Sequence, residues 1–86
     1  MDNERVYFYN ANIEVDFYVP EDELAIQVAY SLNDEQTKER EVTALKKLPN
    51  VHPCSRRIII TYDEETTFTD QYGTIEVIPC WKWMLD

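Results

Sequence analysis

The chain has 86 residues, a formal net charge of −9 and a hydrophobic content of 44%. This length allows one domain, residues 1–86, with one core, and the composition excludes a disordered chain. No apolar run is as long as a membrane span, and the opening residues do not form a basic, hydrophobic signal sequence. We therefore expect a cytoplasmic domain that makes no membrane contact.

The first third of the chain predicts three antiparallel strands. Residues 5–9 are β-branched and aromatic, as is typical of a strand. Apolar and polar residues then alternate with a period of two over 13–19 and again over 24–31. Residues 20–23 join these two strands in a hairpin, which pairs Val19 with Leu24 and Phe17 with Ile26.

This register also predicts the two faces of the hairpin. The polar face brings Glu14, Asp16 and Gln27 close together, with Asp16 directly opposite Gln27. The other face is expected to be buried, and it carries Ile13, Val15, Phe17, Val19, Leu24, Ile26, Val28 and Tyr30.

Residues 33–48 predict an amphipathic helix. Asn33 is the expected N-cap, with Gln36 three positions later in the arrangement of a capping box. Pro49 ends the helix because a proline cannot continue the hydrogen-bond pattern. The inward stripe consists of Val42, Leu45 and Leu48.

The remaining residues predict more strands and a short helix. Residues 57–62 form an apolar, β-branched run, which is typical of a central strand covered on both faces. After a helix, such a strand most simply runs parallel to the strand before the helix. An acid-rich connection with an extended piece at 66–69 follows, then a strand at 74–78. The chain ends in a short helix that is expected to bury Trp81, Met84 and Leu85.

These elements predict an α/β (α+β) fold: a mixed sheet of about four or five strands with a βββαβ core and a short C-terminal helix. One helix cannot cover both faces of such a sheet. We therefore expect the second face to be covered by a preceding segment of a longer protein or by self-association.

Five short motifs, taken in their order along the chain, resemble the C-terminal domain of a prokaryotic family of uncharacterised AAA-type ATPases. They are VDF at 15–17, IQVAYSL at 26–32, T-x-E-R-E at 37–41, RIIITYDEE at 57–65 and I-E-V-I-P-x-W-x-W-M-L at 75–85. The resemblance implies a divergent restriction-endonuclease-like fold of the PD-(D/E)-x-K type. It also implies that ATP is bound only by a preceding domain.

In nucleases of that type, an acidic residue on one strand and an acidic residue or glutamine on the next hold Mg²⁺, and a lysine two positions later helps to orient the attacking water. The resemblance places Asp16 and Gln27 at the metal positions and Ala29 at the lysine position. The hairpin register places the same two residues opposite each other. Glu14 projects from the same predicted face and is a third candidate metal ligand.

Two functions follow from this arrangement. Because one carboxylate and one neutral amide hold Mg²⁺ weakly and the lysine is missing, we expect a non-catalytic, degenerate nuclease-like domain that acts as an interaction or regulatory module. In that case Arg40 pairs inward with Asp16 or Glu14. The alternative is a Mg²⁺-dependent nuclease in which Lys38 or Arg40 on the helix replaces the lysine.

The expected partners are the preceding ATPase domain, a second copy of the chain, or nucleic acid. A basic patch in this otherwise acidic chain suits phosphate, and it consists of Lys46, Lys47, Arg56 and Arg57. Cys54 and Cys80 are too few for a disulfide framework, so we expect free thiols.

Overall fold

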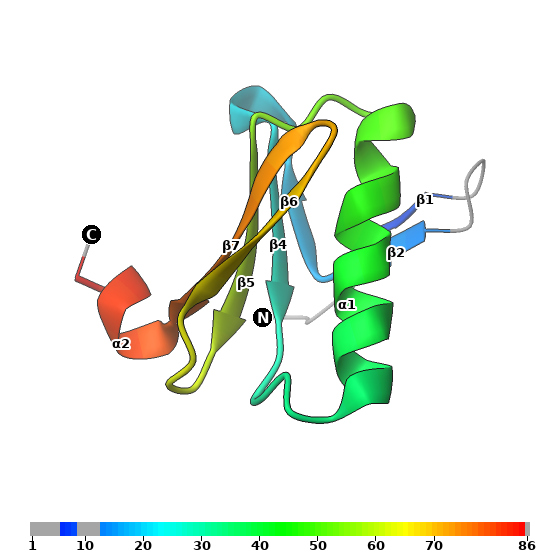
Figure 1. The fold of residues 1–86 in the computed structure, drawn as a ribbon. Helices are drawn as coiled ribbons and strands as arrows, with labels where there is room; N and C mark the ends of the chain where they lie inside the picture. Colours follow the sequence, from blue (N-terminus) through cyan, green and yellow to red (C-terminus); the bar gives the residue numbers. More distant parts are fainter. Residues whose placement is uncertain (1–5, 9–12, 86) are drawn as a thin grey trace.

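The computed structural model describes residues 6–8 and 13–85, which contain a five-stranded mixed sheet and one long helix (Figure 1). The strands of the main sheet follow the order β3-β4-β5-β7-β6, and β1 and β2 form a separate two-stranded sheet. The predicted mixed α/β class is therefore confirmed. In chain order the elements are β1 (Val6–Phe8), β2 (Ile13–Val15), β3 (Phe17–Val19), a 3-10 helix (Pro20–Asp22), β4 (Leu24–Val28), α1 (Glu35–Lys47), a 3-10 helix (Leu48–Asn50), β5 (Arg56–Thr61), β6 (Thr66–Asp70), β7 (Gly73–Pro79) and α2 (Cys80–Trp83).

The middle of the sheet is parallel and its two edges are antiparallel. β4 pairs with β5 and β5 pairs with β7 in parallel, whereas β3 and β6 run antiparallel to their neighbours. The apolar run at 57–62 is thus confirmed as the central strand, and α1 connects it to β4 as a crossover. Gly73 has φ +124, a left-handed conformation that suits glycine, where β6 turns into β7.

Helix α1 lies on one face of the sheet (Figure 1), and its apolar stripe packs into the core there. Val42, Leu45 and Leu48 are buried, as predicted. The helix begins at Glu35 with Asp34 in the N-cap position, one residue later than the expected cap. The Thr37 hydroxyl donates to the Asp34 carboxylate at 2.8 Å, and this bond is the main reason why the pKa of Asp34 is lowered.

The predicted strand at 13–19 is broken at Asp16. The chain bends there, so β2 leaves the main sheet and pairs with β1, while β3 stays on β4. The hairpin register is confirmed, since Phe17 pairs with Ile26 and Val19 with Leu24. The expectation of three successive strands in one sheet is wrong. Of the predicted first strand at 5–9, residues 5 and 9 lie outside the described part of the chain.

The bend also reverses which side chains face the core. Before it, Ile13 and Val15 are buried; after it, Tyr18 packs against the core cluster while Phe17 takes the opposite face. Because Phe17 pairs with Ile26 and cross-strand partners share a face, the same reversal applies to the side chains of β4. A regular strand would have kept Phe17 on the side of Val15.

As a result, the face of β4 that was predicted to be exposed is the buried one. Ala25 and Gln27 lie beneath α1 with exposed fractions of 0% and 3%, whereas Val28 is 51% exposed. Alternation distinguishes the two faces of a strand, but it does not say which face the helix covers. The small Ala25 and the hydrogen-bonded Gln27 fit under the helix.

The terminal helix is present, but its side chains lie mostly in solvent. Trp81, Met84 and Leu85 were expected to be buried, yet their exposed fractions are 59%, 74% and 79%. Trp83 is half-buried, and its ring lies 5.8 Å from the Arg56 guanidinium. A single turn after Pro79 is too short to reach the core. No helix in the described residues is long and apolar enough to cross a membrane.

Candidate functional site

Asp16 and Gln27 meet at the bend between β2 and β3. The backbone N–H of Asp16 donates to Oε1 of Gln27 at 2.9 Å, and the backbone N–H of Val28 donates to Oδ2 of Asp16 at 2.7 Å. The ladder between β3 and β4 ends at the pair of Phe17 and Ile26. The Asp16 carboxylate therefore accepts an N–H that the departing strand does not bind.

These contacts bear directly on the predicted Mg²⁺ ligands. Gln27 is 3% exposed, and its side-chain oxygen is already an acceptor. Mg²⁺ needs oxygen ligands at about 2.0–2.1 Å and keeps several waters. Binding through Oε1 of Gln27 and Oδ2 of Asp16 would weaken two backbone hydrogen bonds. The two side-chain oxygens therefore fit a structural role, in which they hold the bend through hydrogen bonds, better than a Mg²⁺ site.

A cavity of about 460 Å³ opens between β2 and α1. It brings together Glu14, Gln27 and Arg40 from the predicted site, and it adds Glu41. The full lining is Ile13, Glu14, Gln27, Gln36, Glu39, Arg40, Glu41, Thr43, Ala44 and Lys47. Three of the predicted site residues therefore line the same cavity, and one of them, Arg40, belongs to α1.

Glu41 is a site residue that the sequence reasoning missed. It is 5% exposed, an uncommon position for a carboxylate, and Nε of Arg40 donates to it at 3.3 Å. Arg40 pairs with this neighbour rather than with Asp16 or Glu14, and its own side chain is 63% exposed. The signal was present in the helical spacing, because Glu41 lies one turn before the buried Leu45.

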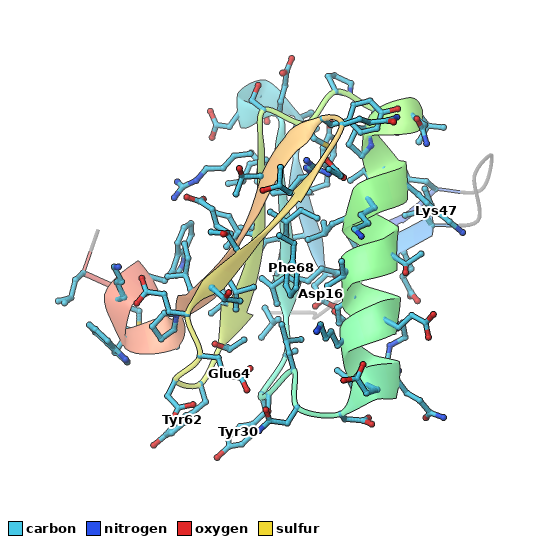
Figure 2. The ribbon with its side chains drawn as sticks, in the orientation of Figure 1. Asp16, Tyr30, Lys47, Tyr62, Glu64 and Phe68 are labelled. Carbon is cyan, nitrogen blue, oxygen red and sulfur yellow. The ribbon has the colours of Figure 1, made fainter. Side chains whose placement is uncertain are left out.

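Lys38, the other candidate cation, points toward the opposite edge of the sheet. Its Nζ lies 5.3 Å from the centroid of the Phe68 ring on β6. Asp16 precedes β3, which is the other edge strand. Asp16 and Phe68 lie close together in the view of Figure 2, but the two residues belong to opposite edges of the sheet. The structure does not bring Lys38 to the Asp16–Gln27 pair.

The four basic residues predicted to contact nucleic acid do not form one patch. Lys46 and Lys47 are exposed in the last turn of α1, and Figure 2 labels Lys47 there. Arg56 lies on the other face of the sheet, where its Nε donates to Oε1 of Glu76 at 2.8 Å. Arg57 is 2% exposed, so the expectation that it contacts phosphate is wrong.

Arg57 instead forms a buried ion pair with Asp70. Its two terminal nitrogens donate to the two carboxylate oxygens at 2.8 Å each, and one also donates to the Leu45 carbonyl at 3.0 Å. This pairing lowers the pKa of Asp70 to about 2 and raises the pKa of Arg57. The pair ties β5 to the end of α1 and to the turn between β6 and β7.

Stability should therefore fall in acid as Asp70 becomes protonated. Its folded pKa of about 2 lies below the ordinary 3.8, so the contribution is complete above about pH 4 and is lost as the pH falls through about 2. The loss should be about 2 kcal/mol. Urea unfolding of the wild type and of Asp70→Asn across this range measures it. If the free energy of unfolding falls equally with pH in the two proteins, this expectation is contradicted.

The loops that follow β4 and β5 are joined by Glu64. Its carboxylate accepts the backbone N–H of Leu32 at 2.7 Å and the hydroxyl of Ser31 at 3.0 Å. Beside them the rings of Tyr30 and Tyr62 stack with centroids 5.2 Å apart, and both are largely exposed (Figure 2). These contacts join residues far apart in the chain, so no local pattern predicted them.

Both cysteines are free thiols, as expected. Cys54 is half-buried, and this burial raises the pKa of its thiol; Cys80 is exposed on α2. Within residues 6–8 and 13–85, no group of three or more His, Cys, Asp or Glu side chains is arranged to hold a metal ion.

Comparison with known proteins identifies one distant relative. It is the uncharacterized protein MJ1544 of Methanocaldococcus jannaschii, with 39% identity over 97 residues. The match covers 99% of this chain and 21% of the relative, so the chain spans about a fifth of that protein's length. No protein-family model and no solved structure matches the chain.

Proposed function

We propose that this chain is a non-catalytic, degenerate nuclease-like domain at the C-terminus of an AAA-type ATPase, where it acts as an interaction or regulatory module. The observation that carries the proposal is the use of Asp16 and Gln27 at the bend. Both side chains bind backbone N–H groups with the oxygens that a nuclease would offer to Mg²⁺. In addition, the resemblance assigns the catalytic lysine to position 29, which is alanine in this chain.

The length of the relative is consistent with a domain that works inside a larger protein. About four fifths of that relative lies outside the match. ATP would be bound by such additional chain, and this domain would contribute contacts rather than chemistry. The free thiols of Cys54 and Cys80 suit a cytoplasmic location. Any contact with nucleic acid would rest on Lys46 and Lys47.

The second candidate is a Mg²⁺-dependent nuclease, and the cavity between β2 and α1 is the observation in its favour. In this candidate Asp16, Gln27 and Glu14 would hold the metal. The cavity brings Glu14 and Gln27 together with Arg40, which would stand in for the missing lysine. This alternative uses the same bend but requires metal binding.

Isothermal titration calorimetry of Mn²⁺ with the domain separates the two candidates. We expect no binding heat, and no cleavage of labelled single- or double-stranded DNA in the presence of Mn²⁺ or Mg²⁺. Binding that disappears in Asp16→Ala and Glu14→Gln, together with cleavage that Arg40→Ala abolishes, would establish the nuclease and overturn the proposal.

A further inference from the structure

The sheet face that points away from α1 carries an apolar surface on its β3–β4 side. We call this surface the open face; it consists of Phe17, Val19, Leu24, Ile26, Val28 and Ile60. Cross-strand partners share a face, and these residues alternate with the buried Ala25 and Gln27. In Figure 1, α1 and the pair β1–β2 lie on the other side of the sheet.

Exposure on this face is greatest at the end of β4. Val28, the last residue of this strand, pairs with Ile60 of β5 but lies beyond the end of the β3 ladder, and it is 51% exposed. The short helix α2 contacts β5 and β7, the part of this face where Ile58 and Ile78 are buried. In the described part of the chain, the β3–β4 side has no such cover. Val28 is exposed and the other five residues of the open face are partly exposed, and such a contiguous apolar surface is a candidate interaction site.

The parallel strands indicate that the missing cover is a helix. β4, β5 and β7 run parallel, and sheets made wholly of parallel strands occur almost only with helices on both faces. Here α1 covers one face, and on the other face the short helix α2 contacts mainly β5 and β7 among the strands. β4 spans about 16 Å at about 3.3 Å per residue, which matches about three turns of helix.

The charged residues around the open face indicate which kind of helix would bind there. Glu21 and Asp22 lie at one end, in the turn between β3 and β4, and Asp63 lies at the other, just after β5; all three are exposed. The basic side chains Arg56 on β5 and Lys82 on α2 are ion-paired with Glu76 and Glu65. A second copy of the chain would bring the same acidic ends and a charge of −9, so like charges would face each other and repel. A helix with basic ends would instead be attracted.

We propose that the open face binds an amphipathic helix of a partner protein, with an apolar stripe that lies across β3 and β4 and with Lys or Arg at both ends. The stripe buries Val28 and Ile26, and the basic ends meet Asp22 and Asp63. This inference rests on the proposed function, because it names the chemistry of the partner that an interaction module would take.

Fluorescence anisotropy with a labelled model peptide tests this proposal. The probe is a helix of about five turns, with Leu at positions i, i+3, i+4 and i+7 and Lys elsewhere. One control peptide has the same composition in scrambled order, and another has Glu in place of Lys. We expect the patterned Lys peptide to bind at least about tenfold more tightly than either control.

Matched variants of the protein locate the binding site. Val28→Lys should weaken binding at least about tenfold, whereas Gln36→Lys, which adds the same charge on α1, should leave it nearly unchanged. Equal binding of the patterned and scrambled peptides, or equal effects of the two variants, would reduce the interaction to charge and overturn the proposal. So would sedimentation that shows a dimer which Val28→Lys dissociates, because a second copy would then be the occupant.

The outcome of the peptide experiment is independent of the Mn²⁺ titration. Metal binding with DNA cleavage would reject the non-catalytic function, whatever the peptide does. Absence of peptide binding with no metal binding would reject only the helix partner.

Discussion

Asp70→Ala should lower the free energy of unfolding by about 3–5 kcal/mol. The substitution leaves the guanidinium of Arg57 buried, at 2% exposed, without the carboxylate that accepts two of its hydrogen bonds. It also removes the acceptor for the backbone N–H of Tyr72 in the turn between β6 and β7. Urea unfolding near neutral pH measures the loss.

The exposed ion pair between Arg56 and Glu76 provides a matched control. Both of its side chains are more than a third exposed, so Glu76→Gln should cost less than about 1 kcal/mol. If Asp70→Ala costs no more than Glu76→Gln does, the buried pair does not hold α1 and the β6–β7 turn together as described.

Asp16→Ala should lower the free energy of unfolding by about 1.5–3 kcal/mol, because it removes the charged acceptor of the Val28 N–H. Asp16→Asn keeps an oxygen in nearly the same place and should recover more than half of this loss. Chemical unfolding of the two variants beside the wild type provides the comparison.

The sign of the change in the free energy of unfolding in Asp16→Ala also distinguishes a structural role for Asp16 from a catalytic one. Catalytic side chains are often held at a cost in stability, so their removal can stabilise a protein. A gain in stability in Asp16→Ala would therefore contradict the structural role and favour the nuclease.

The sequence predicted strand pairing better than it predicted faces. The register of Phe17 with Ile26 follows from matching apolar positions across a short turn, and the structure confirms it. The bend at Asp16 carries no glycine or proline. It depends on a hydrogen bond between the Asp16 backbone N–H and the Gln27 side chain eleven residues away, which no local pattern reports. Because the bend went unseen, the buried face of β4 was assigned to the wrong side.

Side chains with two possible roles were the other source of error. Arg57 reads as a basic surface residue because its partner, Asp70, lies thirteen residues later on another strand. Trp81 and Met84 read as core residues, yet one turn of helix leaves them in solvent. Central strand β5 was predicted correctly because its apolar run needs no partner to be recognised.

The open face links the fold to the proposed function. Parallel strands are typically covered on both faces of their sheet, and α1 covers one face of β4 and β5. The expectation that additional protein covers the second face stays a prediction. Its acidic ends make the prediction specific, because they favour a basic helix over a second copy of the chain.

The most direct test of the central claim is the urea unfolding of the wild type and of Asp16→Asn, each with and without excess Mn²⁺. A ligand that binds only the folded state raises its stability by mass action, about 2.7 kcal/mol at a hundred times the dissociation constant. We expect Mn²⁺ to change neither unfolding curve, since Asp16 serves as a hydrogen-bond acceptor. Stabilisation of the wild type by Mn²⁺ that is lost in Asp16→Asn would contradict the account and restore a metal site at the bend.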